Sequence, residues 1–391
     1  MSTTSLTEIP AFAVNRVPEV HFGPGRGRAI ADDAARIGHP SKPVVLVADR
    51  AMVQLGVADR LTAALEAAGA EVARFDDIAG EPSELQVEAA TDFVRFNAAG
   101  LVICLGGGSA MDIGKIAATI ACTGDSPIDF AMERRPLPRR AVPKICLPTT
   151  AGTGSEFSST NVFADGAHKK VWIWGPETKP ERVVLDPELT VSLPPELTAW
   201  TGLDAFAHAL EASTNVRQHP WTNLNAHRAL HLIAGAVETA VHEPGNLVAR
   251  GQMLVGAAHA GIAIDTCGCA LAHNISHALA ALGPVHHGLA TALALEVVLP
   301  WQVAADRGAF AAAAEACGLG PDAAALPGWY SDLLTRCGVE RRLPAAFREV
   351  SVAALAAEMR APETQPMCQA NVRPVGDADV DRFAAAMLAL A

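Results

Sequence analysis

The chain has 391 residues, half of them hydrophobic, and a formal net charge of −12. On the usual scale of about 100–200 residues per domain, this length predicts two domains. The negative charge argues against nucleic acid and anionic membranes as partners, because both repel an acidic surface. In addition, no uninterrupted apolar run approaches the ~20 residues of a membrane span.

The cysteines and the N-terminus indicate the compartment. Eight cysteines are scattered along the chain without a CxxC pair. A chain of this length needs no disulfides for stability, so we expect reduced thiols. Residues 1–14 lack the basic start and apolar core of a secretory signal. These features predict a cytoplasmic protein.

In the first half of the chain, short apolar runs alternate with helical stretches. The predicted strands are 43–49, 71–75, 100–105 and 143–148, with 183–185 as a candidate fifth. A helix is expected after the first strand, through residue 68. Strands that are apolar on both faces and alternate with helices indicate a parallel sheet covered by helices.

The second half has a different pattern. Long alanine- and leucine-rich stretches with three-to-four spacing predict helices at 196–215, 222–242, 246–264, 269–282 and 288–305. The pair Pro194-Pro195 is interpreted as a hinge. The predicted fold is therefore an α/β domain over 1–191, built on a parallel sheet, followed by an all-helical domain over 192–391.

Two loops in the α/β half are candidates for cofactor binding. Gly106-Gly107-Gly108-Ser109 follows a buried strand and leads into a helix that carries Asp112 and Lys115. Such a turn brings backbone N–H groups and the positive end of the helix dipole up to a phosphate. For the glycines alone, an ordinary tight turn is the alternative. A second loop, Thr149–Glu156, also follows a strand, and two such loops predict a dinucleotide crevice.

Two further features near the N-terminus bear on this crevice. Asp49 ends the first predicted strand, where a carboxylate accepts hydrogen bonds from an adenosine ribose and repels a 2′-phosphate. A helix N-cap is the alternative for Asp49, and both remain open. Gly23–Gly27 superficially resembles a dinucleotide fingerprint but lacks its spacing. We predict a structural turn into a helix at 28–37.

The helical half carries polar residues with metal-ligand spacing. Asp204 and His208 are four residues apart, and His273 and His277 repeat that spacing. Residues four apart lie on one face of a helix, one turn from each other. A buried aspartate that faces histidines needs compensating charge, which a cation supplies.

A turn at Gly283-Pro284 then leads to His286 and His287 at the start of another helix. One carboxylate and three imidazoles on facing helices predict a site for a divalent transition metal. Any one of these histidines alone would more simply be a core or surface residue. That interpretation is given to His219, His227, His231, His242 and His259.

Taken together, these residues resemble the iron-containing, or group III, alcohol dehydrogenases of the dehydroquinate-synthase-like superfamily. The resemblance covers nearly the whole chain in the same order. Its matching elements are Gly106–Ser109 with Asp112 and Lys115, Thr149–Glu156, 183–211, His273–Gly288 and Asn371–Pro374. It implies a dinucleotide-binding domain, a helical metal-binding domain, and an active site between them.

The resemblance also implies roles for individual residues. The implied metal ligands are Asp204, His208, His273 and His287, and His277 is implied in proton transfer beside the nicotinamide. The implied cofactor-contacting residues are Gly107, Gly108, Ser109, Asp112, Thr149, Thr150 and Thr153, with Lys170 near the ribose and Asp49 associated with NAD.

The implied activity is hydride transfer between NAD, or alternatively NADP, and a small alcohol or aldehyde. A divalent metal acts as Lewis acid, with Fe²⁺ favoured and Zn²⁺ the next choice. A homo-oligomer, dimer or larger, is expected. The rival is a sugar-phosphate cyclase-type lyase of the same superfamily, which would need basic residues beside the histidines. Departures from the family pattern are the doubled His286 and the pair Ile264-Asp265.

Overall fold

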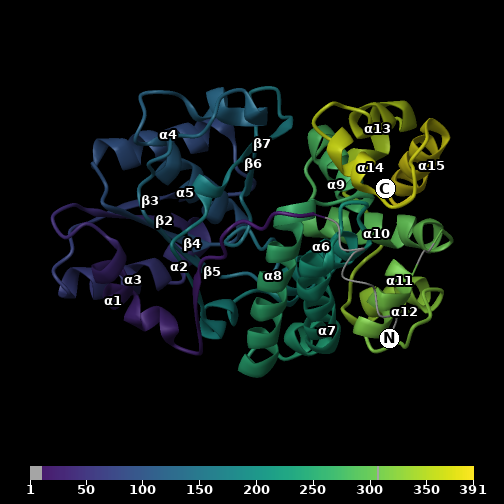
Figure 1. Ribbon diagram of the computed structural model, residues 1–391, viewed down its shortest axis with the longest axis horizontal. Helices are drawn as coiled ribbons and strands as arrows, with labels where there is room; N and C mark the ends of the chain where they lie inside the picture. Colours follow the sequence, from purple (N-terminus) through teal and green to yellow (C-terminus); the bar gives the residue numbers. More distant parts are fainter. Residues whose placement is uncertain (1–10, 306–307) are drawn as a thin grey trace. The chain divides into compact units, whose positions relative to one another are not determined.

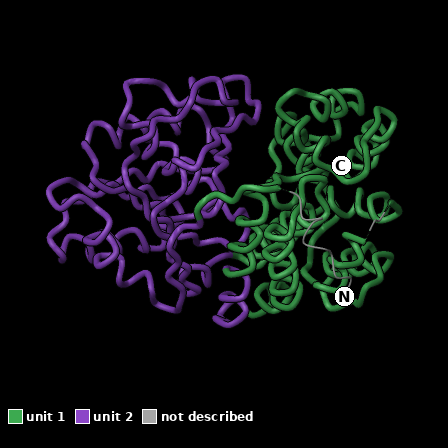
Figure 2. Tube along the Cα trace, viewed as in Figure 1, with its two compact units in different colours: residues 1–16, 194–243, 255–391 green, residues 17–193, 244–254 purple. Residues whose placement is uncertain are grey.

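The computed structural model describes residues 11–305 and 308–391 (Figure 1). The chain divides into two compact units (Figure 2). An α/β unit comprises residues 17–193 and 244–254. A helical unit comprises the described residues of 11–16, 194–243 and 255–391.

A six-stranded parallel sheet forms the centre of the α/β unit. Its order is β1 (Glu19–Phe22), β8 (Arg182–Leu185), β5 (Lys144–Pro148), β4 (Leu101–Gly106), β2 (Val44–Asp49) and β3 (Val72–Ile78). Apart from Asp49, all residues of β2, β4 and β5 are buried, as the continuous apolar runs predict. The predicted parallel α/β fold is confirmed. The edge strand β1 was not predicted.

Helices cover both faces of the sheet (Figure 1). On one face, α1 (Ile30–Ile37) and α3 (Val57–Ala67) pack against Leu46, Ile103 and Ile145. On the other face lies α5 (Gly108–Ile120), with α4 (Glu84–Phe96) beside it. A Cβ at Gly114 of α5 would lie 2.4 Å from Cys104 Sγ, so the helix depends on glycine for its close approach to β4.

Three local features differ from the prediction or extend it. The expected helix through residue 68 is two helices, α2 (Arg50–Gln54) and α3, because Gly56 adopts a left-handed conformation at φ +65°. A continuous helix there was therefore wrong. An antiparallel hairpin of β6 (Thr160–Ala164) and β7 (Lys170–Trp174) was missed, although its strands alternate between buried and more exposed residues.

The turn predicted at Gly23–Gly27 is structural. The backbone N–H groups of Gly25 and Gly27 donate to the two carboxylate oxygens of Asp186, at 2.9 and 2.8 Å. The turn leads into η2 (Arg26–Ala29) and then α1. Its glycines are therefore engaged by a carboxylate of the protein itself.

Long helices make up the helical unit. The five that carry the site or flank it are α6 (Pro195–Thr214), α7 (Pro220–His242), α8 (Leu247–Cys267), α9 (Leu271–Leu282) and α10 (His287–Val303). The others are α11 (Ala309–Ala316), α12 (Ala325–Arg336), α13 (Val352–Met359), α14 (Gln365–Ala370) and α15 (Asp377–Leu388). Helix α6 packs against α7 and α10, and α10 packs against α9. Pro195 is the first residue of α6, a position that proline favours.

Helix α8 is long and apolar enough, by length and composition, to cross a membrane. However, 61% of its apolar 18-residue window is buried inside the structure, as is common for a core helix. Its residues 247–254 belong to the α/β unit and 255–267 to the helical unit.

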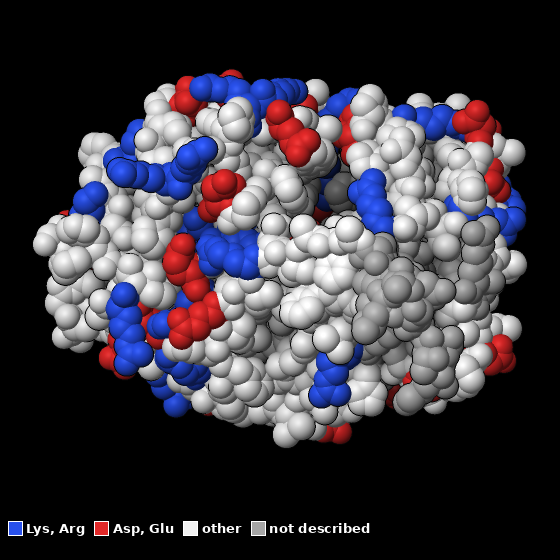
Figure 3. Space-filling view, in the orientation of Figure 1, with Lys and Arg blue, Asp and Glu red and all other residues white. Residues whose placement is uncertain are grey.

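Charged side chains of both signs are distributed over the face shown in Figure 3. Lysine and arginine lie among aspartate and glutamate there, and neither sign forms a continuous area on the described part of this face. At the exposed surface, arginines also pair with aspartates, as in Arg50–Asp77 and Arg360–Asp381. This face therefore offers no extended cationic surface.

Candidate functional site

The strand order changes direction at the carboxyl ends of β2 and β4. After β2, the chain first forms β3 on one side of β2. It then forms β4 on the other side of β2, and β5 beside β4. In open parallel sheets, ligands bind outside the carboxyl ends of the strands at such a switch point. Asp49 ends β2 and Gly106 ends β4.

The glycine loop after β4 is closely packed around these ends. Gly107 N donates to Asp49 Oδ2 at 3.1 Å. Gly106 has φ +151°, and a Cβ on Gly108 would lie 2.7 Å from Thr153 Cγ2, so neither position accepts a side chain. Helix α5 begins at Gly108 without a side-chain cap among the described residues. Its first N–H groups are therefore suited to bind an anion.

The second predicted loop lies against the first. Thr149 N donates to Gly106 O at 2.9 Å, and Thr150 lies beside Gly107, with its Cγ2 3.4 Å from where a Cβ on that glycine would be. Ser109 Oγ donates to Gly80 O at 2.9 Å, in the segment after β3. The structure thus brings together the two loops that the sequence singled out.

Asp112 and Lys115 hold the second loop in position. Asp112 accepts hydrogen bonds from Ser155 Oγ and, at 3.0 Å, from Val162 N. Burial raises the pKa of Asp112. The fully buried Lys115 donates to Ser155 O at 2.5 Å and to Ser158 O at 3.0 Å. Both side chains therefore bind protein atoms of the loop.

Asp49 is the N-cap of α2, one of the two interpretations that its sequence position left open. Its Oδ1 accepts from Met52 N at 3.0 Å and caps α2, while its Oδ2 accepts from Gly107 N. Lys170, at the start of β7, is 11% exposed, and its Nζ lies 2.9 Å from Glu81 Oε2. Since Glu81 follows Gly80, Lys170 lies near the segment that Ser109 contacts.

Glu156, at the end of the second loop, was not singled out from the sequence. Glu156 is 3% exposed. Burial raises the pKa of Glu156 to about 7. The α/β unit therefore holds a carboxyl group that titrates near neutral pH.

In the helical unit, three helices bring the predicted metal ligands together. Asp204 Oδ1 lies 3.5 Å from His273 Nε2 and 3.5 Å from His287 Nε2. Asp204 Oδ2 lies 3.9 Å from His208 Nδ1, one turn along α6. The rings of His208 and His273 stack with their centroids 4.4 Å apart.

Two residues that the sequence analysis missed orient the histidines. Glu211 Oε2 lies 2.6 Å from His273 Nδ1, and Ser276 Oγ lies 3.0 Å from His287 Nδ1. Both contacts engage Nδ1 and leave Nε2 directed at Asp204. Metal-binding histidines are generally held in this way, with one ring nitrogen hydrogen-bonded and the other facing the metal. Glu211 lies seven residues after Asp204 on α6, so helical spacing was a signal for it.

The donor atoms of this cluster fit a divalent cation. Asp204 Oδ1, His208 Nδ1 and His273 Nε2 are buried without a hydrogen-bond partner among the described residues. Each such atom costs about 1–3 kcal/mol when it is left unpaired. Although burial opposes it, the neighbouring histidines lower the pKa of Asp204 well below its usual range. A cation held by Asp204, His273 and His287 would satisfy Asp204 Oδ1 and His273 Nε2 with the carboxylate charged.

Cys269 also belongs to this cluster. The potential ligand atoms form two groups that share His273: Asp204 with His273 and His287, and His208 with Cys269 and His273. Within each group, all ligand atoms lie within 4.8 Å of one another. Burial raises the pKa of the Cys269 thiol, but His273 and His208 outweigh it and lower that pKa to about 7.

The remaining histidines of the run differ in their surroundings. His277 is half-buried, and the centroid of its ring lies 5.5 Å from that of His287. His286 is exposed, lies beside Trp200 with the rings tilted and their centroids 4.9 Å apart, and accepts from Gly288 N at the start of α10. The two adjacent histidines therefore have different surroundings: His287 faces Asp204, and His286 caps α10.

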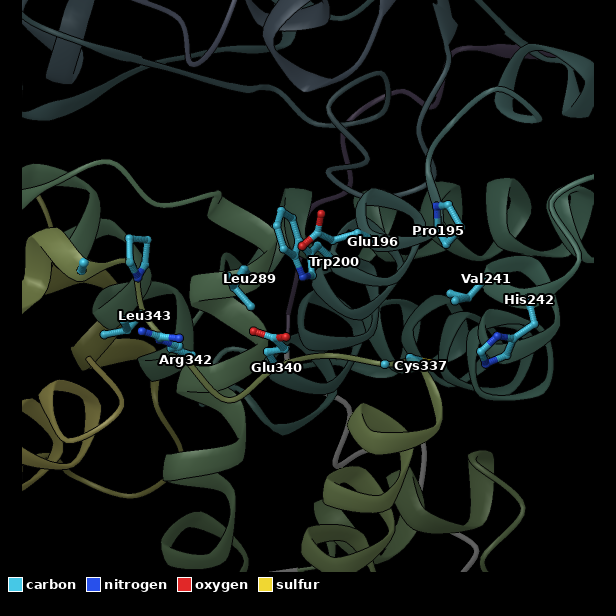
Figure 4. Close-up of a pocket in the computed structure, with 13 residues that line it drawn as sticks. Pro195, Glu196, Trp200, Val241, His242, Leu289, Cys337, Glu340, Arg342 and Leu343 are labelled. Carbon is cyan, nitrogen blue, oxygen red and sulfur yellow. The ribbon is translucent and has the colours of Figure 1, made fainter.

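A cavity of about 580 Å³ lies elsewhere in the helical unit (Figure 4). Trp200, Glu196, Leu289, Glu340 and Arg342 are among the residues that line it. None of the four predicted metal ligands is among the lining residues. The donor cluster therefore does not line this cavity.

Comparison with known families identifies both halves of the chain. Residues 18–187 match the family described as iron-containing alcohol dehydrogenase. Residues 198–382 match the description of its C-terminal part, "Fe-containing alcohol dehydrogenase family, C-terminal". The two matches lie in the order in which the two patterns appear along the chain.

Individual relatives agree with the family match. A long-chain-alcohol dehydrogenase of Geobacillus thermodenitrificans is 34% identical over 72% of this chain and 71% of its own length. A lactaldehyde reductase of Escherichia coli is 30% identical over 71% of this chain and 72% of its own. The crystal structure of a sulfoacetaldehyde reductase from Bifidobacterium kashiwanohense, in complex with NAD⁺, superimposes with a TM-score of 0.87 at 29% identity, over 98% of this chain and all of that one.

Proposed function

This chain belongs to the iron-containing alcohol dehydrogenase family and is an oxidoreductase acting on CH–OH donors, and on that basis we propose that it moves a hydride between NAD and a small alcohol or aldehyde at a metal centre. The observation that carries this proposal is the cluster of buried, unpaired donor atoms on Asp204, His208 and His273. NADP remains the alternative cofactor. The sugar-phosphate cyclase reading is not favoured, since the matched relatives are alcohol dehydrogenases and aldehyde reductases.

We assign cofactor binding to residues 1–191. Gly107, Gly108 and Ser109 open the helix whose N-terminal N–H groups would receive the pyrophosphate. The loop residues Thr149, Thr150 and Thr153 lie against that turn. Asp49 would accept the ribose hydroxyls and disfavour a 2′-phosphate, and Lys170 would lie near a ribose. Asp112 would serve the cofactor by holding the second loop through Ser155.

We assign metal binding to residues 192–391, with Asp204, His208, His273 and His287 as ligands. When bound, the cation supplies Lewis acidity toward the substrate oxygen. Glu211 and Ser276 keep the Nδ1 atoms of His273 and His287 engaged, so that their Nε2 atoms face Asp204. His277, half-buried and beside His287, would pass the proton between substrate and solvent.

The substrate is a small-molecule alcohol or carbonyl compound, and its identity does not transfer from relatives as different as a long-chain-alcohol dehydrogenase and a lactaldehyde reductase. We further propose a cytoplasmic enzyme that works as a homo-oligomer, without nucleic acid or membrane as a partner. Eight free thiols and the mixed surface charge support these assignments (Figure 3).

The test combines metal analysis with a cofactor-linked assay. The purified protein should contain close to one divalent cation per chain and should change nicotinamide absorbance with some members of a panel of alcohols and aldehydes. NAD should be preferred over NADP. A metal-free preparation with full turnover would contradict the metal centre, and phosphate release from a sugar phosphate would favour the lyase.

A further inference from the structure

A cysteine lies among the donor atoms of the proposed metal centre. Cys269 Sγ lies within 4.8 Å of the ligand atoms of both His208 and His273, and His273 in turn belongs to the group with Asp204 and His287. Ligand atoms that bind one ion at about 2.0–2.3 Å cannot be more than about 4.6 Å apart, even on opposite sides of it. The sulfur is therefore close enough to share an ion with both histidines after small side-chain shifts.

The backbone around Cys269 is held by several hydrogen bonds. Glu211 accepts from Ala270 N at 2.7 Å and from Ala272 N at 2.6 Å, on the C-terminal side. On the other side, Asn215 Nδ2 donates to Cys267 O at 3.1 Å and to Gly268 O at 3.2 Å. Since Glu211 lies in α6 and Asn215 is its C-cap, the position of Cys269 is set by the helix that carries Asp204 and His208 and by the residue that follows it.

A second observation points to a ligand at this place. His208 Nδ1 and His273 Nε2 are unpaired among the described residues, and the two side chains are 6% and 2% exposed. Cys267, whose Sγ lies 3.3 Å from Ala263 O within α8, belongs to no group of potential ligand atoms among the described residues. The difference between the two cysteines lies in the unpaired imidazole nitrogens.

We propose that Cys269 is an additional ligand of the cation, and that its sulfur biases this centre toward zinc over iron(II). The inference rests on the proposed metal centre. On coordination, the thiol loses its proton to solvent and the sulfur donates an electron pair to the ion. Thiolates are soft donors, which favour zinc over iron(II) more than imidazole and carboxylate do.

Cobalt(II) is the probe for the sulfur ligand. The whole protein is stripped with a chelator, reloaded with Co²⁺ under anaerobic conditions and examined by absorption spectroscopy. Wild type should show a near-ultraviolet sulfur-to-cobalt charge-transfer band together with visible d–d bands. Cys269→Ser should lose the charge-transfer band and keep the d–d bands, whereas the matched control Cys267→Ser should keep both.

The possible failures are distinguishable. Cobalt bound without a charge-transfer band in wild type overturns the sulfur ligand but leaves the metal centre. Failure of wild type to bind cobalt overturns both. If Cys269→Ser does not fold, X-ray absorption spectroscopy of zinc-loaded wild type decides the question, because it detects a sulfur ligand by its zinc–sulfur distance of about 2.3 Å.

Metal competition tests the selectivity. Stripped protein is equilibrated anaerobically with equal concentrations of Zn²⁺ and Fe²⁺, and the bound metals are counted. Loss of a ligand should lower metal affinity at least as much as loss of a residue that only hydrogen-bonds to a ligand. We therefore expect the bound zinc-to-iron ratio to fall about tenfold or more in Cys269→Ser. An unchanged ratio would show that the sulfur does not set the choice of metal.

Discussion

The α/β unit and the helical unit hold their candidate sites by different means. In the α/β unit, the start of α5 has no side-chain cap among the described residues, and there is no room for a side chain at Gly106 or Gly108. In the helical unit, the donors are side chains from α6, α9 and α10, oriented by Glu211 and Ser276. A backbone site is disturbed by adding an atom. A side-chain site is disturbed by removing one.

This contrast predicts that each site can be damaged alone. A change in the donor cluster should remove the metal and leave cofactor binding, and a change in the glycine loop should do the reverse. A substitution in one unit that abolishes the ligand of the other would break the comparison.

The largest effect is expected at Asp204. Asp204→Asn should lose the bound metal and lower dehydrogenase turnover by about a thousandfold or more, since Lewis-acid catalysis contributes several kcal/mol. Metal content by mass spectrometry and the NAD-linked rate measure the two losses, and NAD affinity should not change. His259→Gln is the control, because His259 bonds to Asn225 outside the cluster and should retain the metal. Full activity without metal would contradict the assignment.

Glu156 should make stability depend on pH. Between the ordinary value of 4.5 and about 7, the folded chain keeps a proton on Glu156 that the unfolded chain releases. The free energy of unfolding therefore falls as the pH rises through this window. Glu156→Gln cannot ionise and should be more stable than wild type at pH 8 by about 3 kcal/mol, but not at pH 4.

Guanidinium unfolding across this pH range tests the prediction, with the exposed Glu66→Gln on α3 as the control. An identical pH dependence in wild type and Glu156→Gln would show that Glu156 ionises normally. Because Glu156 lies in the α/β unit, metal content should be the same in both proteins.

Glu211 is expected to act on the metal through His273. Glu211→Gln removes the carboxylate that orients the imidazole, and metal affinity should fall by about 10–100-fold. Competition with a chromophoric chelator measures the affinity. Glu238→Gln, which breaks an exposed ion pair with Arg336, serves as the matched control. Wild-type metal affinity in Glu211→Gln would mean that Glu211 only holds the start of α9.

The smallest effect belongs to the glycine loop. In Gly108→Ala the new methyl group meets Thr153 at 2.7 Å, and overpacking of this kind costs about 1–3 kcal/mol. NAD affinity, measured by calorimetry, should fall by about tenfold. Metal content should stay at the wild-type level. Gly124→Ala is the control, since nothing lies within 4 Å of its Cβ position, and equal losses in both would sink the packing argument.

Much of the fold could be predicted because its signals are local. The predicted strands at 43–49, 71–75, 100–105 and 143–148 match β2, β3, β4 and β5 within a few residues, since buried parallel strands are continuous apolar runs. The break at Gly56 was missed because a glycine inside a helical pattern does not by itself show a left-handed conformation. The β6–β7 hairpin was missed although alternation marks both strands.

The site was less predictable, because its contacts are long-range. Spacing on one helix pairs Asp204 with His208, but only the folded chain brings His273 next to Glu211, 62 residues earlier. The same holds for Cys269, whose place beside His208 depends on the turn between α8 and α9. The sequence pattern also could not tell which of His286 and His287 faces Asp204, because the two residues are adjacent and differ only in where their side chains point. The catalytic and ligand roles stay predictions.

The three hydrogen bonds that Glu211 accepts, from Ala270 N, Ala272 N and His273 Nδ1, are made by protein atoms alone. The start of α9 is therefore held by contacts within the protein, unlike small zinc domains that fold only around their metal. We expect such a centre to accept different ions in turn. We expect the polypeptide to stay folded when one ion leaves and another enters, so that the ion found in a preparation would also depend on the metals that the cell supplies.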